Sequence, residues 1–264
     1  MAGDDEVLYT VADGVARVTI NRPARRNALT WTAVEALSQH LVAAGEDPDV
    51  RVVVVTGAGA TFCAGVDLAT MAEGAPYAVL HHARGGIARL FRQLWSLGKP
   101  TIAAVRGFAV AGGFGLALAC DLVVCTPDAV FAAPEIDVGL WPFMITVPMV
   151  RSMPPKKALE LMLTGRRVGA EEAEHIGFVT RVVPLAEFEA AVAELAGVLA
   201  AKSPTAMKLG RDSFYAVWDL AAAEALAVLH PLLTVATGTE DAKEGMAAFR
   251  EKRPPEWGGK SPPG

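Results

Sequence analysis

The amino-acid sequence predicts an α/β fold with a helical C-terminal part, and two observations favour this class. Through the first two-thirds of the chain, short apolar runs of strand length alternate with longer stretches of helical periodicity. That alternation is typical of parallel strands joined by crossover helices. From Met153 onward the pattern becomes mostly helical. Because no low-complexity linker separates the two parts, we expect one chain-long domain, with a core over residues 1–200 and a helical subdomain over residues 201–264.

The first predicted elements are a hairpin and a helix. Apolar and polar residues alternate from Val7 to Asn21 around Asp13-Gly14, a dipeptide that favours a tight hairpin turn. Thr30 can cap the helix that follows, whose apolar residues recur at helical spacing until about Gly45.

Three buried strands are expected after this helix. The run "RVVVVTG" (51–57) is apolar on both faces, as in a strand inside a parallel sheet. A helix is predicted from about Ala78 to Leu97, and Pro100 then favours an extended start for "TIAAVRG" (101–107). The run "LVVCT" (122–126) has the same character.

The last third of the chain is predicted to be helical, because caps and glycine stops mark a series of segments. Helices are expected around Lys156–Leu163, Ala170–His175, Leu185–Ala201, Pro204–Ala236 (broken) and Asp241–Lys252. The tail is rich in proline and glycine, and we expect it to be loosely ordered beyond Trp257.

Composition restricts the function classes. Hydrophobic residues make up 52% of the 264 residues, which allows a sizeable core, and the net charge of -5 argues against a nucleic-acid partner. Cys63, Cys120 and Cys125 have neither disulfide nor zinc spacing, so no metal site is predicted. The acidic start "MAGDDEVLYT" lacks the features of a signal peptide. We therefore expect a cytoplasmic protein with no membrane partner.

Glycine-rich turns follow two of the predicted strands. Gly57 and Gly59 suggest a dinucleotide-binding loop, but Phe62 occupies the place of the third glycine, which argues against that site. The stretches "FCAGVDL" (62–68) and "AVAGGFG" (109–115) each open a predicted helix. Backbone N–H groups at helix starts are unpaired, so two converging turns of this kind could form an oxyanion hole. Close packing between elements is the alternative explanation for the paired glycines.

The order of several motifs resembles the enoyl-CoA hydratase/isomerase (crotonase) family. The motifs are "NRPARRNAL", "FCAGVDL", "GFAVAGGFGLALACD", "FAAPEIDVGL", "LTGRRVGAEEAEHIGFVTRVVP" and "EGMAAFREKRPP". The resemblance implies a crotonase-like (ClpP/crotonase) spiral of repeated ββα units with a helical C-terminal trimerisation region. It also implies a homotrimer or a hexamer of two trimers, an acyl-CoA thioester substrate, and a place in fatty acid metabolism such as β-oxidation. No separate cofactor is implied, because CoA is part of the substrate.

The resemblance assigns roles to individual residues. The oxyanion hole would be formed by the N–H groups of Val66 and Gly112, and the catalytic carboxylate would be Glu135. Substrate and CoA binding would involve Arg25, Arg26, Ala64, Asp67, Leu68, Gly113, Pro134, Phe143, Phe249 and Lys252. From the residues alone, the arginine pair could also be a solvated turn, and Asp67 could simply cap a helix.

One position departs from the hydratase pattern and decides which reaction we expect. Hydratases of this family use two glutamates, and the first falls on Gly115. Hydration needs one group to activate water and another to protonate Cα, whereas moving a double bond between C3 and C2 needs one base to shuttle a proton. We therefore expect a Δ3–Δ2-enoyl-CoA isomerase, with a single-glutamate hydratase and a non-catalytic acyl-CoA-binding protein as alternatives.

Two further features concern the same pocket. Trp141 and Phe143, in "WPFMI", are expected to crowd the space of a second carboxylate, unless they simply pack in the core. Asp137 could face the pocket only if its segment is extended. Apolar neighbours of Glu135 should raise its pKa toward the range of a general base.

Overall fold

The computed structural model describes residues 5–67 and 76–258. Its main sheet has six strands in the order β1-β2-β3-β4-β6-β9, and a second sheet has three in the order β5-β7-β8. The main-sheet strands are β1 Val7–Ala12, β2 Val15–Ile20, β3 Val52–Gly57, β4 Thr101–Val105, β6 Leu122–Cys125 and β9 Arg181–Val182. The second sheet consists of β5 Phe108–Val110, β7 Val130–Ala132 and β8 Val168–Gly169. This architecture confirms the α/β class.

The hairpin and the first helix form as predicted. Strands β1 and β2 are antiparallel, and Asp13 and Gly14 between them have φ values of 51° and 76°. Positive φ at both central residues is the geometry of the turn that matches strand twist. Helix α1 (Trp31–Glu46) is capped by Thr30, whose side chain accepts a hydrogen bond from the Ala33 N–H at 2.9 Å.

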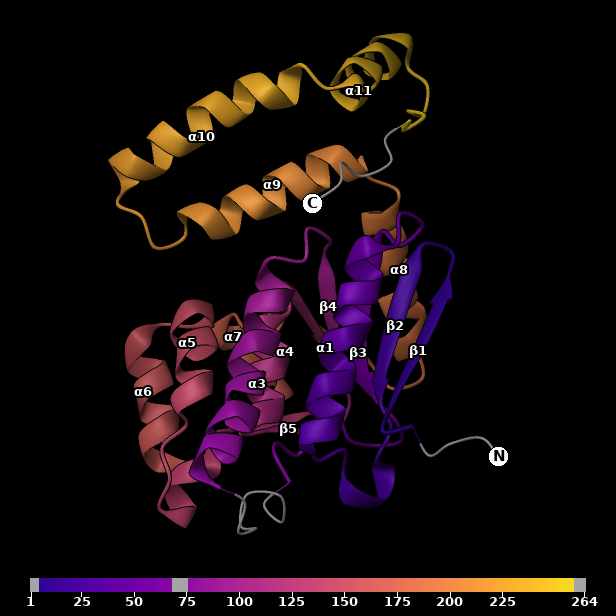
Figure 1. The fold of residues 1–264 in the computed structure, drawn as a ribbon. Helices are drawn as coiled ribbons and strands as arrows, with labels where there is room; N and C mark the ends of the chain where they lie inside the picture. The colour runs from indigo at the N-terminus through magenta and orange to yellow at the C-terminus, as the bar shows by residue number, and fades with distance from the viewer. Residues whose placement is uncertain (1–4, 68–75, 259–264) are drawn as a thin grey trace.

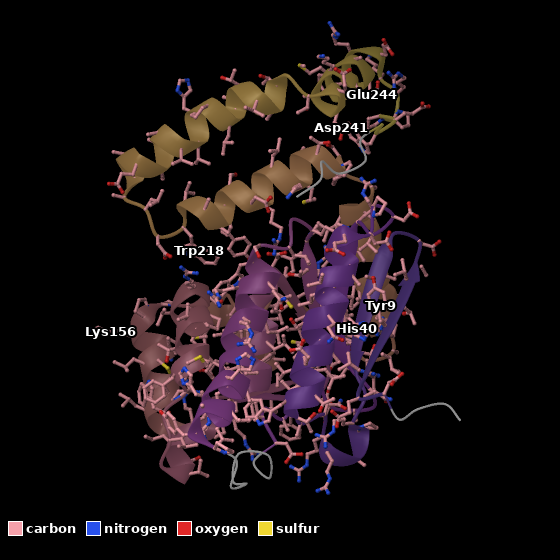
Figure 2. The ribbon with its side chains drawn as sticks, in the orientation of Figure 1. Tyr9, His40, Lys156, Trp218, Asp241 and Glu244 are labelled. Atoms are coloured by element: carbon pink, nitrogen blue, oxygen red, sulfur yellow. The ribbon has the colours of Figure 1, made fainter. Side chains whose placement is uncertain are left out.

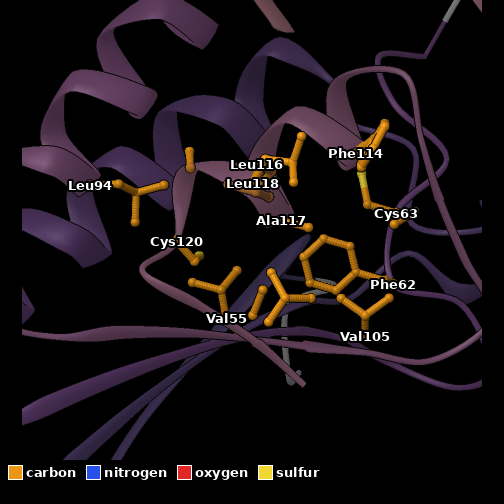
Figure 3. Packing of buried hydrophobic residues seen from close by; sticks show 14 of the residues in the cluster. Val55, Phe62, Cys63, Leu94, Val105, Phe114, Leu116, Ala117, Leu118 and Cys120 are labelled. Carbon is orange, nitrogen blue, oxygen red and sulfur yellow. The ribbon is translucent and has the colours of Figure 1, made fainter. Parts of the chain in front are cut away.

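The central parallel strands are buried on both faces, as predicted for 51–57. Val53 and Val55 of β3 pack in the larger core cluster beneath α1, α3 (Tyr77–Trp95) and α4 (Gly112–Ala119). Val52 and Val54 point to the opposite face and pack against α8 (Phe188–Ala200). Figure 3 shows the larger cluster between α4 and the sheet.

The C-terminal half contains more helix than the sequence predicts. Helix α5 (Phe143–Ser152) contains Pro148 and lies in a stretch with no predicted helix. The other helices are α6 Pro155–Thr164, α7 Ala170–Ile176, α9 Pro204–Val217, α10 Ala222–Thr237 and α11 Glu240–Glu251. The break between α9 and α10 falls within the segment predicted to be broken. The predicted loose tail beyond Trp257 lies mostly outside the described residues.

Helices α9, α10 and α11 form a layer at one end of the molecule (Figure 1). Arg211 of α9 attaches this layer to the core, because its guanidinium donates to Asp121 at 2.8 Å and to the carbonyl oxygens of Trp95 and Leu94. Asp121 also accepts hydrogen bonds from the Thr101 N–H at 2.7 Å and the Thr101 hydroxyl at 2.9 Å, so its carboxylate has a structural role. On the neighbouring helix α5, the Arg151 guanidinium lies 5.2 Å from the ring of Trp218, the residue that follows α9 (Figure 2).

Among the described helices, none alone is long and apolar enough to cross a bilayer, although α10 and α11, bent by 67°, meet that test as a pair.

Candidate active site

The two glycine turns identified in the sequence lie against each other. Cys63 and Ala109 form a parallel bridge, in which the Cys63 N–H donates to Phe108 and the Val110 N–H donates to Cys63, both at 2.9 Å. A Cβ atom added to Gly65 would lie 2.8 Å from Ala111 Cβ and 3.2 Å from the Gly112 nitrogen. Only glycine allows this approach, and the φ of Gly65 is also positive, at 91°.

The start of α4 leaves backbone donors unused at this junction. Ala111 has a φ of 52°, a conformation that costs a non-glycine residue roughly 1–3 kcal/mol. The first bond of the helix runs from the Gly115 N–H to the Ala111 carbonyl. Within the described part of the chain, the N–H groups of Val66 and Gly112 donate no hydrogen bond. Both can therefore point partial positive charge at one acceptor.

Gly113 is buried against the other turn. A Cβ atom at this position would lie 2.3 Å from the carbonyl oxygen of Cys63. The glycine is thus required for close packing, the alternative given for this pair, and its predicted substrate contact stays a prediction.

Glu135 is held near the glycine turns by the second sheet. Strand β7 pairs with β5 in parallel, and the Ala111 N–H donates to the Ala132 carbonyl at 2.9 Å. Ala133 then leads into a 3-10 helix, Pro134–Val138, which carries Glu135 at its second position.

The carboxyl group of Glu135 has the environment of a general base. Burial raises its pKa, and a hydrogen bond from its own backbone N–H offsets part of that rise. Its Oε2 atom is buried and has no hydrogen-bond partner among the described residues. An unsatisfied buried carboxylate oxygen is costly, and such groups cluster at functional sites.

The position that departs from the hydratase pattern has no room for a side chain. A Cβ atom on Gly115 would lie 2.3 Å from Ile145 Cγ2 and 2.8 Å from Phe91 Cζ. The expectation that Phe143 helps to fill this space is therefore corrected, whereas the crowding by Trp141 stays a prediction. The Phe143 residue is 70% exposed, whereas Trp141 packs partly buried against the core cluster.

Asp137 does not lie on an extended segment, which was the condition for it to face the pocket. It belongs to the 3-10 helix and is exposed. A Cβ atom on Gly165 would lie 3.1 Å from its Oδ2, so the carboxylate lies beside the C-terminal end of α6.

The predicted CoA residues of the first loop lie together at the surface. Arg25 ends the 3-10 helix η1 (Pro23–Arg25), and both it and Arg26 are exposed. The Ala64 N–H donates to the Arg26 carbonyl at 3.0 Å, which joins this loop to the first glycine turn. Asp67 forms an ion pair with Arg22 at 3.2 Å, and Leu68 lies outside the described residues.

The C-terminal substrate residues lie apart from this site within one chain. Phe249, on α11, is 86% exposed, and Lys252 follows the helix in an exposed position. Helix α11 packs on α9 and α10, at the end of the molecule opposite β5 (Figure 1).

Sequence reasoning missed three residues of this region: Ile145 and Phe91, which fill the space at Gly115, and Arg22, which contacts Asp67. Arg22 stands in the motif "NRPARRNAL", three residues before the arginine pair, and no local pattern places it beside Asp67.

Comparisons with known proteins agree on one family. The model of the family described as Enoyl-CoA hydratase/isomerase matches residues 10–260. The chain is 36% identical to a carnitinyl-CoA dehydratase of Proteus mirabilis, over 95% of this chain and 97% of that protein. It is 35% identical to a 2,3-dehydroadipyl-CoA hydratase of Escherichia coli, over 97% and 99%. A crystal structure of an enoyl-CoA hydratase from Mycobacterium smegmatis superposes with a TM-score of 0.92 and 33% identity, over 96% of this chain and 98% of that one.

Proposed function

This chain belongs to the enoyl-CoA hydratase/isomerase family, and on that premise we propose that it is a Δ3–Δ2-enoyl-CoA isomerase. The family and the crotonase-type fold of its solved relatives show an enzyme of the enoyl-CoA hydratase/isomerase type, and they support an acyl-CoA thioester as its substrate. The isomerase assignment is our proposal within that family.

In the proposed reaction the thioester oxygen accepts hydrogen bonds from the N–H groups of Val66 and Gly112. Glu135 removes a proton from C2, and the electron pair moves into a dienolate whose negative oxygen the two donors stabilise. The same carboxyl group then returns the proton at C4, so that the double bond moves from C3 to C2 and no water is consumed. Losing one such donor typically lowers the rate about 10²–10³-fold.

The space around Gly115 is the observation that favours isomerisation. Ile145 and Phe91 fill the volume into which a side chain at residue 115 would extend. A second acid is therefore missing from the place where the hydratases of this family carry one. Hydration would leave both water activation and protonation to Glu135, whereas isomerisation asks for one proton shuttle.

A hydratase is the second candidate, and the names of the relatives favour it. The Proteus mirabilis and Escherichia coli proteins are called a dehydratase and a hydratase. In this alternative, Glu135 and backbone groups would hold the attacking water.

A simple absorbance assay tests the proposal, because a 2-enoyl thioester is conjugated and a 3-enoyl thioester is not. Purified protein should raise the ultraviolet absorbance of a 3-enoyl-CoA as the double bond becomes conjugated. Replacing Glu135 with Gln should lower this rate by at least about 10²-fold, the usual contribution of a general base. A non-catalytic acyl-CoA-binding protein would show no activity in either form while still binding CoA esters.

We also propose that the chain assembles into a homotrimer, or a hexamer of two trimers, through its helical subdomain (residues 201–264). Support comes from α10, which has no buried residue in the single chain. Leu226 and Leu233 are 67% and 64% exposed, and apolar surface of this kind is usually covered by a partner. Sedimentation equilibrium should give three or six times the chain mass of 27.7 kDa, and a monomer at micromolar concentration would overturn this assignment.

We further propose a cytoplasmic location, which the three buried, unpaired cysteines support.

A further inference from the structure

Arg22 connects three segments at the edge of the proposed oxyanion hole. Its guanidinium Nε lies 2.7 Å from Glu6 Oε1, and its Nη1 lies 3.2 Å from Asp67 Oδ2. Nη1 also donates to the carbonyl oxygen of Ala28. The Arg22 side chain is only 17% exposed, so these contacts are shielded from solvent more than a typical surface pair.

The residues that Arg22 contacts flank Val66. Leu29 forms a parallel bridge with Val66: the Leu29 N–H donates to Gly65 at 2.7 Å, and the Asp67 N–H donates to Leu29 at 2.8 Å. Arg22 joins Ala28, on one side of this bridge, to Asp67, on the other. Two contacts therefore hold the peptide that carries the Val66 N–H: the bridge between Leu29 and Val66, and the Arg22 guanidinium, which binds residues on both sides of that bridge.

The backbone of Arg22 is itself held firmly. Its N–H donates to Asn27 Oδ1 at 2.9 Å, and Asn27 is fully buried. The Asn27 Nδ2 in turn donates to Ala58 at 2.9 Å and to Thr61 at 2.6 Å. The Arg22 side chain therefore extends from a loop whose backbone is held by hydrogen bonds.

Charge gives Arg22 a second effect on the same peptide. The Asp67 carboxylate belongs to the residue directly after Val66, and a negative charge there disfavours a developing oxyanion. The guanidinium beside it offsets that charge and forms a charge-assisted hydrogen bond.

We propose that Arg22 is a positioning residue for the oxyanion hole, holding the Val66 N–H in place through Ala28 and Asp67. This inference rests on the proposed function in one respect, the use of the Val66 N–H as a donor to the thioester oxygen. Arg22 itself does not touch the reacting atoms in this assignment.

The test uses 4-(dimethylamino)cinnamoyl-CoA, a thioester whose absorption band moves to longer wavelength when its carbonyl oxygen accepts hydrogen bonds. The shift reports the oxyanion hole directly, whether the enzyme isomerises or hydrates. The variants are Arg22→Met, Asp67→Asn and the control Arg17→Met, which removes the exposed ion pair between Arg17 on β2 and Glu189 on α8. Shifts are measured at saturating protein, together with kcat and KM for a 3-enoyl-CoA.

We expect Arg22→Met to lose more than half of the band shift and to lower kcat about 10- to 100-fold, with KM within about threefold, because misplacing a reacting group by 1 Å costs about 10²-fold. The control should match the wild type.

A full band shift and wild-type kcat in Arg22→Met would overturn the proposal. If that variant does not fold, Asp67→Asn decides: a reduced shift supports the positioning role, and an unchanged or larger shift, which loss of the Asp67 charge alone would produce, refutes it. A wild type that shifts the band but does not isomerise would refute only the isomerase assignment.

Discussion

Adding a side chain at Gly115 should destabilise the protein, and shortening the Ile145 side chain that it would meet should relieve that effect. A Cβ atom there would lie 2.3 Å from Ile145 Cγ2, whereas carbon atoms pack at about 3.5–4.0 Å, so Ile145 must move by more than about 1 Å. Overpacking of this kind costs about 1–3 kcal/mol, which we expect for Gly115→Ala. Ile145→Ala should cost about 2–5 kcal/mol, because Ile145 is 2% exposed and leaves a cavity.

The double variant carries the decisive information. Alanine at residue 145 makes room for the added Cβ at residue 115, and that Cβ partly fills the cavity. The loss of stability in the double variant should therefore be smaller than the sum of the two single losses by about 1–3 kcal/mol. Urea unfolding followed by circular dichroism at fixed protein concentration measures all four free energies of unfolding. Gly210→Ala is the control, because nothing lies within 4 Å of its added Cβ in α9 and it should stabilise by about 0.4–1 kcal/mol. A Gly115→Ala variant as stable as the wild type, or strictly additive losses, would refute the packing described here.

Three further predictions concern charge and reactivity. Burial raises the pKa of Glu135, so kcat/KM should rise with pH through a midpoint above 4.5. A raised carboxyl pKa stabilises the folded state only at pH values below that pKa, and this contribution is lost as pH rises. Glu135→Gln should therefore increase the melting temperature at pH 7, and a decreased melting temperature would contradict the burial of the carboxyl group. Burial also raises the pKa of Cys63 and Cys125 to about 12, so the native protein should not react with a thiol reagent at pH 8 until it is denatured. Removing the guanidinium that pairs with Asp121, by Arg211→Met, should cost about 3–5 kcal/mol in urea unfolding, because it leaves a carboxylate largely buried without its cation.

The elements that could be predicted from the sequence are those with local signals. The Asp13-Gly14 turn and the Thr30 cap depend on residues within a few positions, and both form as expected. The two glycine turns could also be recognised locally as helix starts that follow strands, whereas their convergence is seen in the folded chain, at the Cys63–Ala109 bridge.

The features that escaped prediction depend on contacts between distant residues or on context that overrides local preference. Pro148 argues against a helix, yet α5 forms around it because its apolar residues, such as Ile145 and Met149, are buried. The space at Gly115 is filled from α3 and α5, and no linear pattern reveals which side chain from another helix will enter it. Arg22 meets Asp67 across 45 residues of sequence, and only the folded chain brings them together.

The measurement that tests the central claim most directly is a comparison of initial rates on two substrates of equal chain length, a 3-enoyl-CoA and a 2-enoyl-CoA, with one preparation of the protein. Isomerisation raises the thioester absorbance and hydration lowers it, so the two reactions have opposite signs in the same assay. With Glu135 as the single carboxylate and no room for a second one at Gly115, we expect rapid isomerisation, and hydration slower by at least about 10²-fold, the usual contribution of one acid–base group. Rapid hydration of the 2-enoyl-CoA with no isomerisation of the 3-enoyl-CoA would contradict the account.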